Sequence, residues 1–264
     1  MSTLFTIKKK INSIKKISKI ANTMKIIAIS KINKAKNNFL LNSEFQKEFL
    51  NIIPHLINEE QNNDIPTNLY VVFTSTMGMA GAYNTNVLKL AVKNIAKTDK
   101  VIVFGDKGSK YFINKKNNNV IKHIEINDKT FEFFNIKYVS DMVARLFVNK
   151  KIGKVNVIYS KFIKNKIVPQ VSEVLPFDKA AFEGYYEKTN FNFDTNKKHV
   201  LRDVINLYVE SVIYACVLEA KLCEHISRKN AMTQASSNID DTIYDLKNIY
   251  NKKRREKITQ ELAR

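Results

Sequence analysis

Two short glycine-containing segments are the first candidates for chemistry in this sequence, because each follows a run of residues typical of a buried strand. They are Gly78-Met79-Ala80-Gly81 and Gly105-Asp106-Lys107-Gly108. Such glycines could cradle a phosphate at the N-terminus of the next helix, where unpaired N–H groups and the helix dipole favour an anion. Neither segment has the Gly-x-Gly-x-x-Gly spacing of a dinucleotide site or the Gly-Lys-Ser/Thr end of a P-loop. Tight turns at strand ends are therefore the favoured interpretation, and we predict no cofactor.

Side chains that could act as acids, bases, nucleophiles or metal ligands form no recognisable site. The adjacent carboxylates Asp240-Asp241 and Glu59-Glu60 have the pattern of a solvated helix surface. Cys216 and Cys223 are seven residues apart, which on one helix is about 10 Å of rise and too far for a disulfide. Four histidines show no metal-ligand spacing with these cysteines: His55, His123, His199 and His225. We therefore predict no catalytic residue and no metal, and a part in catalysis only through mechanical coupling.

The composition favours a basic protein with a real core. The chain has 264 residues, of which 44% are hydrophobic, and a formal net charge of +19. Such a charge points to nucleic acid, anionic lipid or an acidic protein partner. Nucleic acid is disfavoured, because only six of the 44 basic residues are Arg, the residue suited to bidentate contacts. No run of 18 apolar residues predicts a membrane span, and richness in Lys, Asn and Ile is typical of an AT-rich bacterial genome.

Glycine and proline, which interrupt helices, are confined to the middle of the chain. All glycines lie between Gly78 and Gly184, and all prolines between Pro54 and Pro176. The two ends instead repeat apolar residues every three or four positions, so we predict two helices of about 55 to 65 residues, each roughly 80–100 Å long, that pair antiparallel. The stripe of the first helix, with slips that indicate stutters, comprises Leu4, Ile7, Ile11, Ile14, Ile17, Ala21, Met24, Ala28, Ile32, Ala35 and Phe39.

The middle alternates runs typical of strands with runs typical of helices. The predicted strands are Asn68–Ser75, Lys100–Gly105, Val120–Ile126 and Lys154–Phe162. The predicted helices between them are Thr85–Lys97, Lys107–Asn114 and Lys129–Asn149. This alternation predicts a Rossmann-like α/β domain with a mainly parallel sheet. The predicted domains are 1–62 for the first shaft helix, 63–195 for the α/β domain and 196–264 for the second shaft helix, and the two shaft helices form a coiled coil.

Three segments resemble the gamma subunit of F-type ATP synthases. Residues 11–36, with Met24-Lys25 inside them, are similar to the N-terminal helix of that family. Residues 75–86 lie where the family has a glycine-containing turn from strand to helix, and Gly78, Gly81, Tyr83 and Asn84 match it. Residues 224–262 resemble the C-terminal helix closely. The matching positions there include Glu224, His225, Arg228, Ala231, Met232, Ala235, Asn238, Leu246, Tyr250, Asn251, Arg254, Ile258, Thr259, Glu261 and Leu262.

The resemblance implies a non-catalytic rotor subunit of the central stalk. Its paired terminal helices would turn inside a ring of three alpha and three beta subunits, coupling ATP synthesis or hydrolysis at the beta subunits to proton transport. The α/β body would lie near epsilon and the membrane rotor ring, so the protein is expected as a peripheral component at the cytoplasmic face of the cell membrane. The implied contacts with the lever and catch loop of beta are Met24, Lys25, Arg254, Arg255 and Thr259, and the implied apolar bearing is Ile258 with Leu262.

Some positions depart from the family pattern. Thr76-Met77 stands where family members usually carry Asp-Arg, Ala80 stands where they carry Cys, and Arg255 replaces a Gln. The turn formed by Thr76, Met77, Gly78 and Gly81 would contact the lower partners, and its lost charge pair leaves two interpretations open. The chain is an ordinary synthase subunit, or it is a gamma-like rotor of a divergent ATPase that transmits force to another machine. A basic nucleic-acid-binding coiled coil is a remote alternative, because it would not account for an inserted α/β domain.

Overall fold

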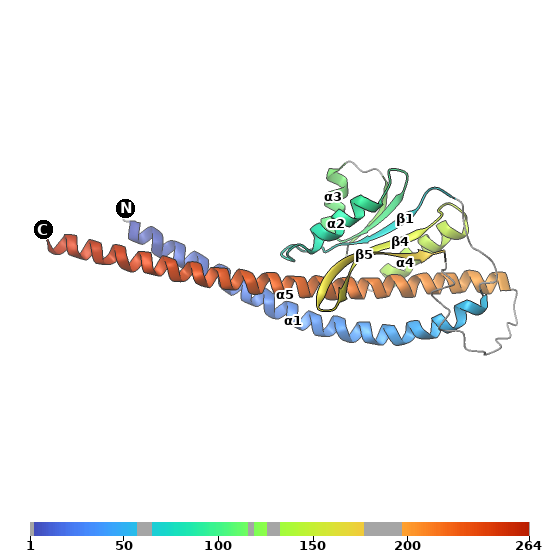
Figure 1. Ribbon diagram of the computed structural model, residues 1–264, viewed down its shortest axis with the longest axis horizontal. Coiled ribbons are helices and arrows are strands. Elements are labelled where there is room, and N and C mark those ends of the chain that lie inside the picture. Colours follow the sequence, from blue (N-terminus) through green and yellow to red (C-terminus); the bar gives the residue numbers. More distant parts are fainter. Residues whose placement is uncertain (1–2, 57–64, 116–118, 126–132, 177–196, 264) are drawn as a thin grey trace. The chain divides into compact units, whose positions relative to one another are not determined.

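The computed structural model describes residues 3–56, 65–115, 119–125, 133–176 and 197–263. Within these residues, two long helices stand at the ends of the chain, with five strands and three shorter helices between them in sequence (Figure 1). In chain order the elements are α1 (Thr3–Leu56), β1 (Leu69–Phe73), α2 (Tyr83–Asn94), β2 (Lys100–Phe104), α3 (Asp106–Asn114), β3 (Val120–Ile124), α4 (Phe133–Val148), β4 (Val155–Ile163), β5 (Lys166–Leu175) and α5 (Lys197–Leu262).

The chain divides into two compact units. The first, called here the shaft unit, consists of Met1–Ile32, Met79–Gly81 and His225–Arg264. The second, the body unit, consists of Asn33–Gly78 and Ala82–Glu224. Both long helices therefore contribute to both units. The domain limits predicted near residues 62 and 195 lie outside the described residues, so that division stays a prediction.

The body unit is built on a sheet with the strand order β3-β2-β1-β4-β5. β1 pairs in parallel with β2 and with β4, and β2 pairs in parallel with β3. β5 pairs with β4 in antiparallel orientation and closes one edge. The prediction of a mainly parallel sheet is thus confirmed, whereas the sequence reasoning did not find β5.

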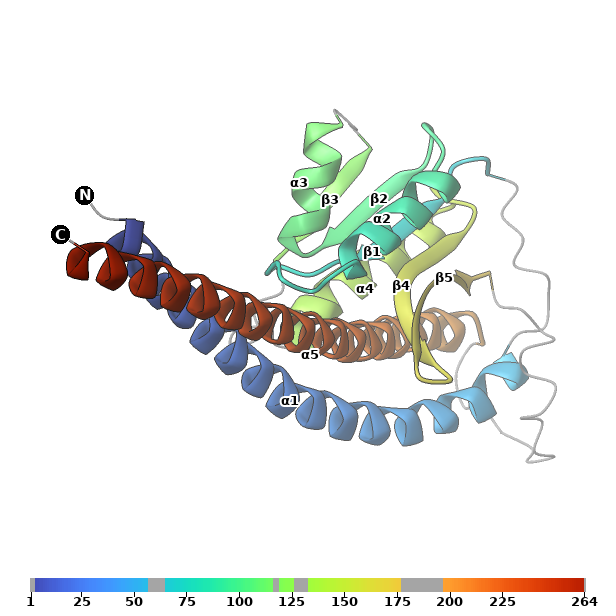
Figure 2. The same ribbon diagram turned by 60° about the vertical axis from the view of Figure 1, so that its left-hand side comes forward.

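Helices cover both faces of this sheet (Figure 2). Successive side chains of a strand point to opposite faces. On β1, Leu69, Val71 and Phe73 belong to a core cluster with α4 and α5, whereas Tyr70 and Val72 belong to a cluster with α2 and α3. All five residues are buried, which is typical of a central parallel strand and accounts for its unbroken apolar run.

The carboxylate of Asp99 is buried beside the N-terminal ends of β1 and β2. Asp99 is 2% exposed, and its two oxygens accept hydrogen bonds from the backbone N–H groups of Asn68 at 2.9 Å and Ala96 at 2.8 Å. Each bond gives a backbone donor its partner, so Asp99 has a structural role.

In the shaft unit, the N-terminal part of α1 and the C-terminal part of α5 lie side by side and run antiparallel (Figures 1 and 2). Ser236 Oγ on α5 donates a hydrogen bond to Asn22 Oδ1 on α1 at 3.3 Å. Ile17 of the predicted stripe is 53% exposed, and Ser18 is half-buried instead. Burial on α1 thus follows a seven-residue spacing through Ser18 and through Ala21, and the predicted stripe is wrong at Ile17.

The predicted fold class is confirmed: an N-terminal helix, a central α/β domain and a long C-terminal helix. None of the helices that the structure describes combines the length and the apolar character needed to cross a lipid bilayer.

Candidate functional site

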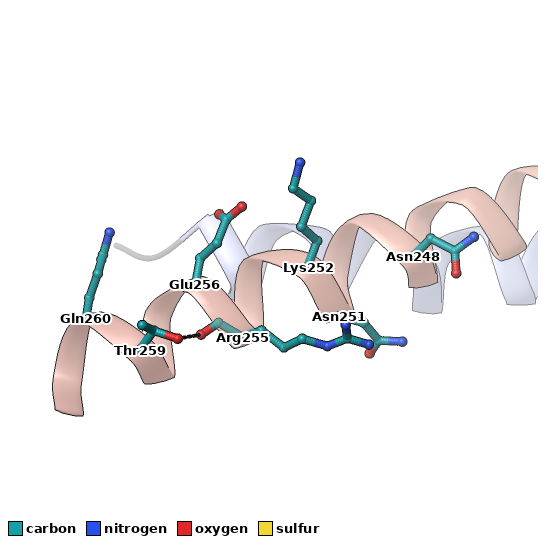
Figure 3. Close-up of a pocket in the computed structure, with 7 residues that line it drawn as sticks. All are labelled: Asn248, Asn251, Lys252, Arg255, Glu256, Thr259 and Gln260. Carbon is teal, nitrogen blue, oxygen red and sulfur yellow. Dashed lines mark hydrogen bonds between the residues drawn. The ribbon is translucent and has the colours of Figure 1, made fainter. Parts of the chain in front are cut away.

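The last turns of α5 carry an open hollow along one side of the helix (Figure 3). Its lining residues recur every three or four positions, so they share one helix face: Asn248, Asn251, Lys252, Arg255, Glu256, Thr259 and Gln260. Thr259 Oγ1 donates a hydrogen bond to the Arg255 carbonyl at 3.0 Å, and the Arg255 side chain extends along the helix towards Asn251 (Figure 3). Two of the predicted beta contacts, Arg255 and Thr259, therefore lie together on one exposed polar surface.

A neighbouring face of the same helix end is apolar. Arg254, Ile258 and Leu262 follow one another at four-residue intervals, so they line up along α5. Ile258 is 43% exposed and Leu262 is 83% exposed. These two exposed side chains are the ones that the resemblance implies for the apolar bearing.

Met24 and Lys25 form a separate surface on α1. Both are half-buried, while Ile26 directly after them is exposed. The Asn22–Ser236 hydrogen bond places this part of α1 level with residue 236 of α5. Arg254 lies 18 residues farther along α5, which is about 27 Å. The five predicted beta contacts thus fall into two groups at different heights on the shaft unit.

The turn after β1 is ordered by hydrogen bonds of Ser75. The Ser75 N–H donates to Asn84 Oδ1 at 2.9 Å, and Ser75 Oγ donates to the Met77 carbonyl at 2.6 Å. Thr76 is half-buried, and Met77 is about half exposed. The turn therefore presents a thioether to solvent at the place where the resemblance leads one to expect a charge pair.

The three residues that follow, Met79–Gly81, rest directly on α5 within the shaft unit. Ser227 Oγ donates a hydrogen bond to the Ala80 carbonyl at 2.7 Å. A Cβ atom added at Gly81 would lie 3.6 Å from Ser227 Oγ and 3.7 Å from Ala231 Cβ. Sequence reasoning missed this contact, because its only signal is the small size of Ser227 and Ala231.

The glycines of the second segment, Gly105 and Gly108, allow close packing against the end of β1. Gly105 has φ 86°, and a Cβ atom there would lie 2.2 Å from the Thr74 carbonyl oxygen. The Gly108 N–H, which a phosphate would need, donates instead to Thr74 Oγ1 at 2.9 Å. Asp106 places a carboxylate in the first turn of α3, 3.5 Å from His123 Nε2. An anion would be repelled there, and this geometry supports the interpretation as a tight turn.

A cavity of about 230 Å³ in the body unit is lined by residues of α1, β4, β5 and α5. Four buried polar side chains lie on its wall: Tyr159, Ser211, Cys216 and Glu219. Gln170 Nε2 donates a hydrogen bond to the Tyr159 hydroxyl at 2.8 Å. Burial raises the pKa of the Cys216 thiol to about 12, and the nearby Glu219 carboxylate adds to the shift. Burial also raises the pKa of Glu219, against the opposing effect of Lys161. At neutral pH the thiol is therefore protonated and unreactive.

No metal site is found in the part of the chain that the structure describes, because no three His, Cys, Asp or Glu side chains there lie close enough together to hold an ion. His225 and Arg228 are buried in the shaft unit, and Arg228 Nη1 lies 3.3 Å from His225 Nδ1. A guanidinium group can only donate, so that imidazole nitrogen accepts the bond and carries no proton. Neither residue lines the α5 hollow or the body-unit cavity described above.

Comparison with known proteins decides the family. A family model described as ATP synthase matches residues 3–263 of the chain. The ATP synthase gamma chain of Ureaplasma urealyticum is 32% identical, over 99% of this chain and 97% of the relative. The ATP synthase gamma chain of Mycoplasmopsis pulmonis is also 32% identical, over 100% of this chain and 97% of the relative. This chain belongs to the ATP synthase gamma chain family.

Solved structures share the fold of this gamma-family chain. The rotor of the Euglena gracilis mitochondrial ATP synthase has a TM-score of 0.73 at 17% identity, covering 97% of this chain and 99% of the other. The central stalk of the Tetrahymena thermophila mitochondrial ATP synthase has a TM-score of 0.64 at 22% identity, covering 82% and 99%. Family membership makes the chain a rotor-type subunit of an ATP synthase. The contact roles of its individual residues stay predictions.

Proposed function

We propose that this gamma-family chain is the central shaft of a rotary ATP synthase or ATPase and supplies no catalytic group itself. It would couple rotation to ATP synthesis or hydrolysis at beta-type subunits and to proton transport. The observation that carries the proposal is the family match over residues 3–263, combined with an antiparallel helix pair whose end exposes apolar side chains.

The apolar tip of α5 suits a bearing. A partner that covers Ile258 and Leu262 would stabilise the complex, by about 1.5–3 kcal/mol for each aliphatic side chain that becomes fully buried. Burial of apolar surface is non-directional, so the gain depends little on the angle of the shaft inside a surrounding apolar ring. Such a contact holds the tip in place and still allows it to turn.

The lysine-rich face of α1 suits a weak and repeated attraction. α1 carries no acidic residue before Glu44, and its exposed lysines in the shaft unit are Lys8, Lys9, Lys10, Lys15, Lys16 and Lys19. An exposed ion pair contributes only about 0–1 kcal/mol, and salt screens it over about 8 Å at physiological ionic strength. Together with Met24, Lys25, Arg254, Arg255 and Thr259, this face would attract an acidic lever segment of beta without locking the rotor at one angle.

The proposed partners are three alpha and three beta subunits, together with epsilon and the membrane rotor ring. One related structure, from Euglena gracilis, is described as containing OSCP, F1 and a c-ring. We place the protein at the cytoplasmic face of the cell membrane as a peripheral component. Washing membranes with alkaline carbonate should then release it, and retention after the wash would contradict the placement.

A second candidate function rests on the β1–α2 turn. Met77 is about half exposed where the resemblance leads one to expect a charge pair with Thr76. A rotor that keeps its head but meets different lower partners would tolerate this change. In that case the shaft would transmit force from ATP hydrolysis to another machine.

One experiment separates these functions. A biotin-acceptor tag is inserted between Lys164 and Asn165, which form the exposed two-residue turn between β4 and β5. Hairpin tips of this kind tolerate insertions. The tagged chain is isolated gently from its native cells, with untagged cells as the control, and its partners are identified by mass spectrometry and tested for ATPase activity.

The outcomes are distinct. Alpha- and beta-type subunits in threefold excess over the tagged chain, with ATPase activity, support the shaft. Epsilon and a ring subunit in the same sample indicate an ordinary synthase, whereas unfamiliar proteins in their place indicate the divergent motor. Recovery of nucleic acid, or of no nucleotide-binding subunit, would sink the proposal.

A further inference from the structure

The turn Met79–Gly81 has an unusual position in the chain. In sequence it joins β1 to α2, two elements of the body unit, yet it belongs to the shaft unit. The chain therefore passes between the two units by three routes. Two are α1, which crosses after Ile32, and α5, which crosses after Glu224. The third is this turn, which leaves the body unit at one end and returns to it at the other. The turn is the only one of these crossings that is not part of a long helix.

Side chains of α5 hold the turn in the shaft unit. Ser227 Oγ donates a 2.7 Å hydrogen bond to the Ala80 carbonyl, and Gly81 packs close to Ser227 and Ala231. The length of this hydrogen bond is the usual one for a hydroxyl donor, which favours about 2.7–2.8 Å. It links residues 147 apart in sequence, so it is a tertiary constraint and forms no part of a local turn pattern.

The backbone conformation of the turn needs such a constraint. Met79 has φ 60° and Gly81 has φ 55°. A side chain other than that of Gly is disfavoured at positive φ, and it persists there only where the surroundings impose it. Ala80, whose carbonyl accepts the bond from Ser227, lies between these two residues. The strained conformation leaves Met79 about half exposed.

We propose that Ser227 is a positioning residue that clasps the Met79–Gly81 turn to α5, so that the turn and the shaft helix rotate as one piece. The clasp gives the body a third mechanical connection to the shaft besides α1 and α5, and it holds the Met79 side chain in a fixed, outward position. The proposal rests on the rotor function proposed above and adds the path by which torque leaves the shaft.

The test measures torsional stiffness in the assembled complex. The head is fixed to glass, a bead is attached to the biotin tag at Lys164–Asn165, and the angular variance of the bead is recorded between catalytic steps. If three connections of equal stiffness act in parallel, loss of one raises the variance about 1.5-fold, because the angular variance is inversely proportional to the total torsional stiffness and packed elements transmit the strain. We expect this increase for Ser227→Ala and a native variance for Ser227→Thr, which keeps the hydroxyl.

The control is Ser237→Ala, a change of the same type at an exposed position of the same helix. It matches the effect of the substitution on helix propensity and removes no contact to the turn. Its variance should equal that of the native complex, so an increase with Ser227→Ala alone isolates the hydrogen bond.

A disulfide replaces the clasp covalently. The 3.7 Å between an added Cβ at Gly81 and Ala231 Cβ matches the ordinary Cβ–Cβ distance of a disulfide. In the variant with Gly81→Cys, Ala231→Cys and Ser227→Ala, oxidation should return the variance to the native value, and reduction should raise it again. Native Cys216 and Cys223 are buried, and the native complex receives the same oxidation as a control.

Two results would overturn the clasp. One is an unchanged variance in Ser227→Ala. The other is slower rotation after oxidation of the Gly81→Cys/Ala231→Cys variant with Ser227 intact, because a turn that must move against α5 would then be blocked. A complex that lacks nucleotide-binding subunits and does not rotate would refute the rotor function itself, and that failure is distinguishable from failure of the clasp.

Discussion

Replacing Gly105 by alanine should destabilise the body unit strongly. The new Cβ would lie 2.2 Å from the Thr74 carbonyl oxygen, 2.8 Å from the Thr74 carbonyl carbon and 2.9 Å from the Ser75 carbonyl carbon. All three are backbone atoms at the end of β1, so relief requires the strand end to move. That shift would disturb the hydrogen bond from the Thr74 N–H to the Phe104 carbonyl, at 2.9 Å in the native chain.

The magnitude follows from two contributions. A side chain at φ 86° and ψ 147°, a backbone region essentially restricted to glycine, costs about 1–3 kcal/mol. Forcing an extra methyl group into packed surroundings costs about 1–3 kcal/mol more. The total of about 2–6 kcal/mol corresponds to a fall in melting temperature on the order of 10 °C, at about 2–4 °C per kcal/mol for a unit of this size.

The assay is thermal unfolding of the full chain, followed by circular dichroism, with Gly78→Ala as the matched control. A Cβ at Gly78 would meet only the flexible end of Lys107, at 3.6 Å. The control should therefore stay within about 0.5 kcal/mol of the native chain. Equal stability of the two variants would refute the argument from packing. A rise in melting temperature of the native chain on adding phosphate or nucleotide would favour an anion site at Gly105 instead.

Three further predictions follow from single features of the fold. Asp99→Ala should lower the free energy of unfolding by about 1–3 kcal/mol in denaturant titrations, because two part-buried hydrogen bonds from backbone N–H groups lose their acceptor. Asp99→Asn should lower it less, and equal losses would contradict this account. Burial raises the pKa of Glu210 and of Glu219 in the folded chain above the ordinary 4.5. The folded chain then binds these protons more tightly than the unfolded chain, so their stabilising contribution is present below about pH 4.5 and is lost as pH rises through the folded-state pKa values. The double variant Glu210→Gln/Glu219→Gln should flatten this fall in melting temperature with pH, and an unchanged pH profile would count against it. Leu262→Asp should leave the melting temperature unchanged, since the side chain is largely exposed. The same variant should lower the recovery of head subunits with the tagged chain, whereas Leu262→Met should recover them as the native chain does. Normal recovery with Leu262→Asp would exclude a bearing at this residue.

The predictable part of the fold is the part with strong local patterns. Lack of Gly and Pro with an apolar helical rhythm predicts α1 and α5, and β-branched runs predict the four parallel strands. β5 escaped detection because Pro169 lies inside it, and proline argues against a strand. The structure accommodates Pro169 because β5 is an edge strand, paired only with β4. Edge position is a tertiary property that the local sequence does not carry.

The site residues divide in a similar way. The resemblance singled out Ile258 and Leu262, and both side chains are exposed at the end of α5. The contact of Ser227 with Ala80 could not be predicted, because it joins residues 147 apart and involves one hydroxyl and one carbonyl.

The inward face of α1 in the shaft unit carries smaller side chains than is usual in a coiled coil. In an autonomous coiled coil, large aliphatic side chains occupy the inward positions. Here Ile11 is buried, but the other buried positions of this part of α1 are Ala21 and Ala28, while Ile17, Ile20 and Ile26 are each more than half exposed. Small inward residues bury little apolar area, so they stabilise the helix pair only weakly. The exposed isoleucines would add stability where a partner covers them, and Ile17 is among them because Ser18 takes the inward position beside it.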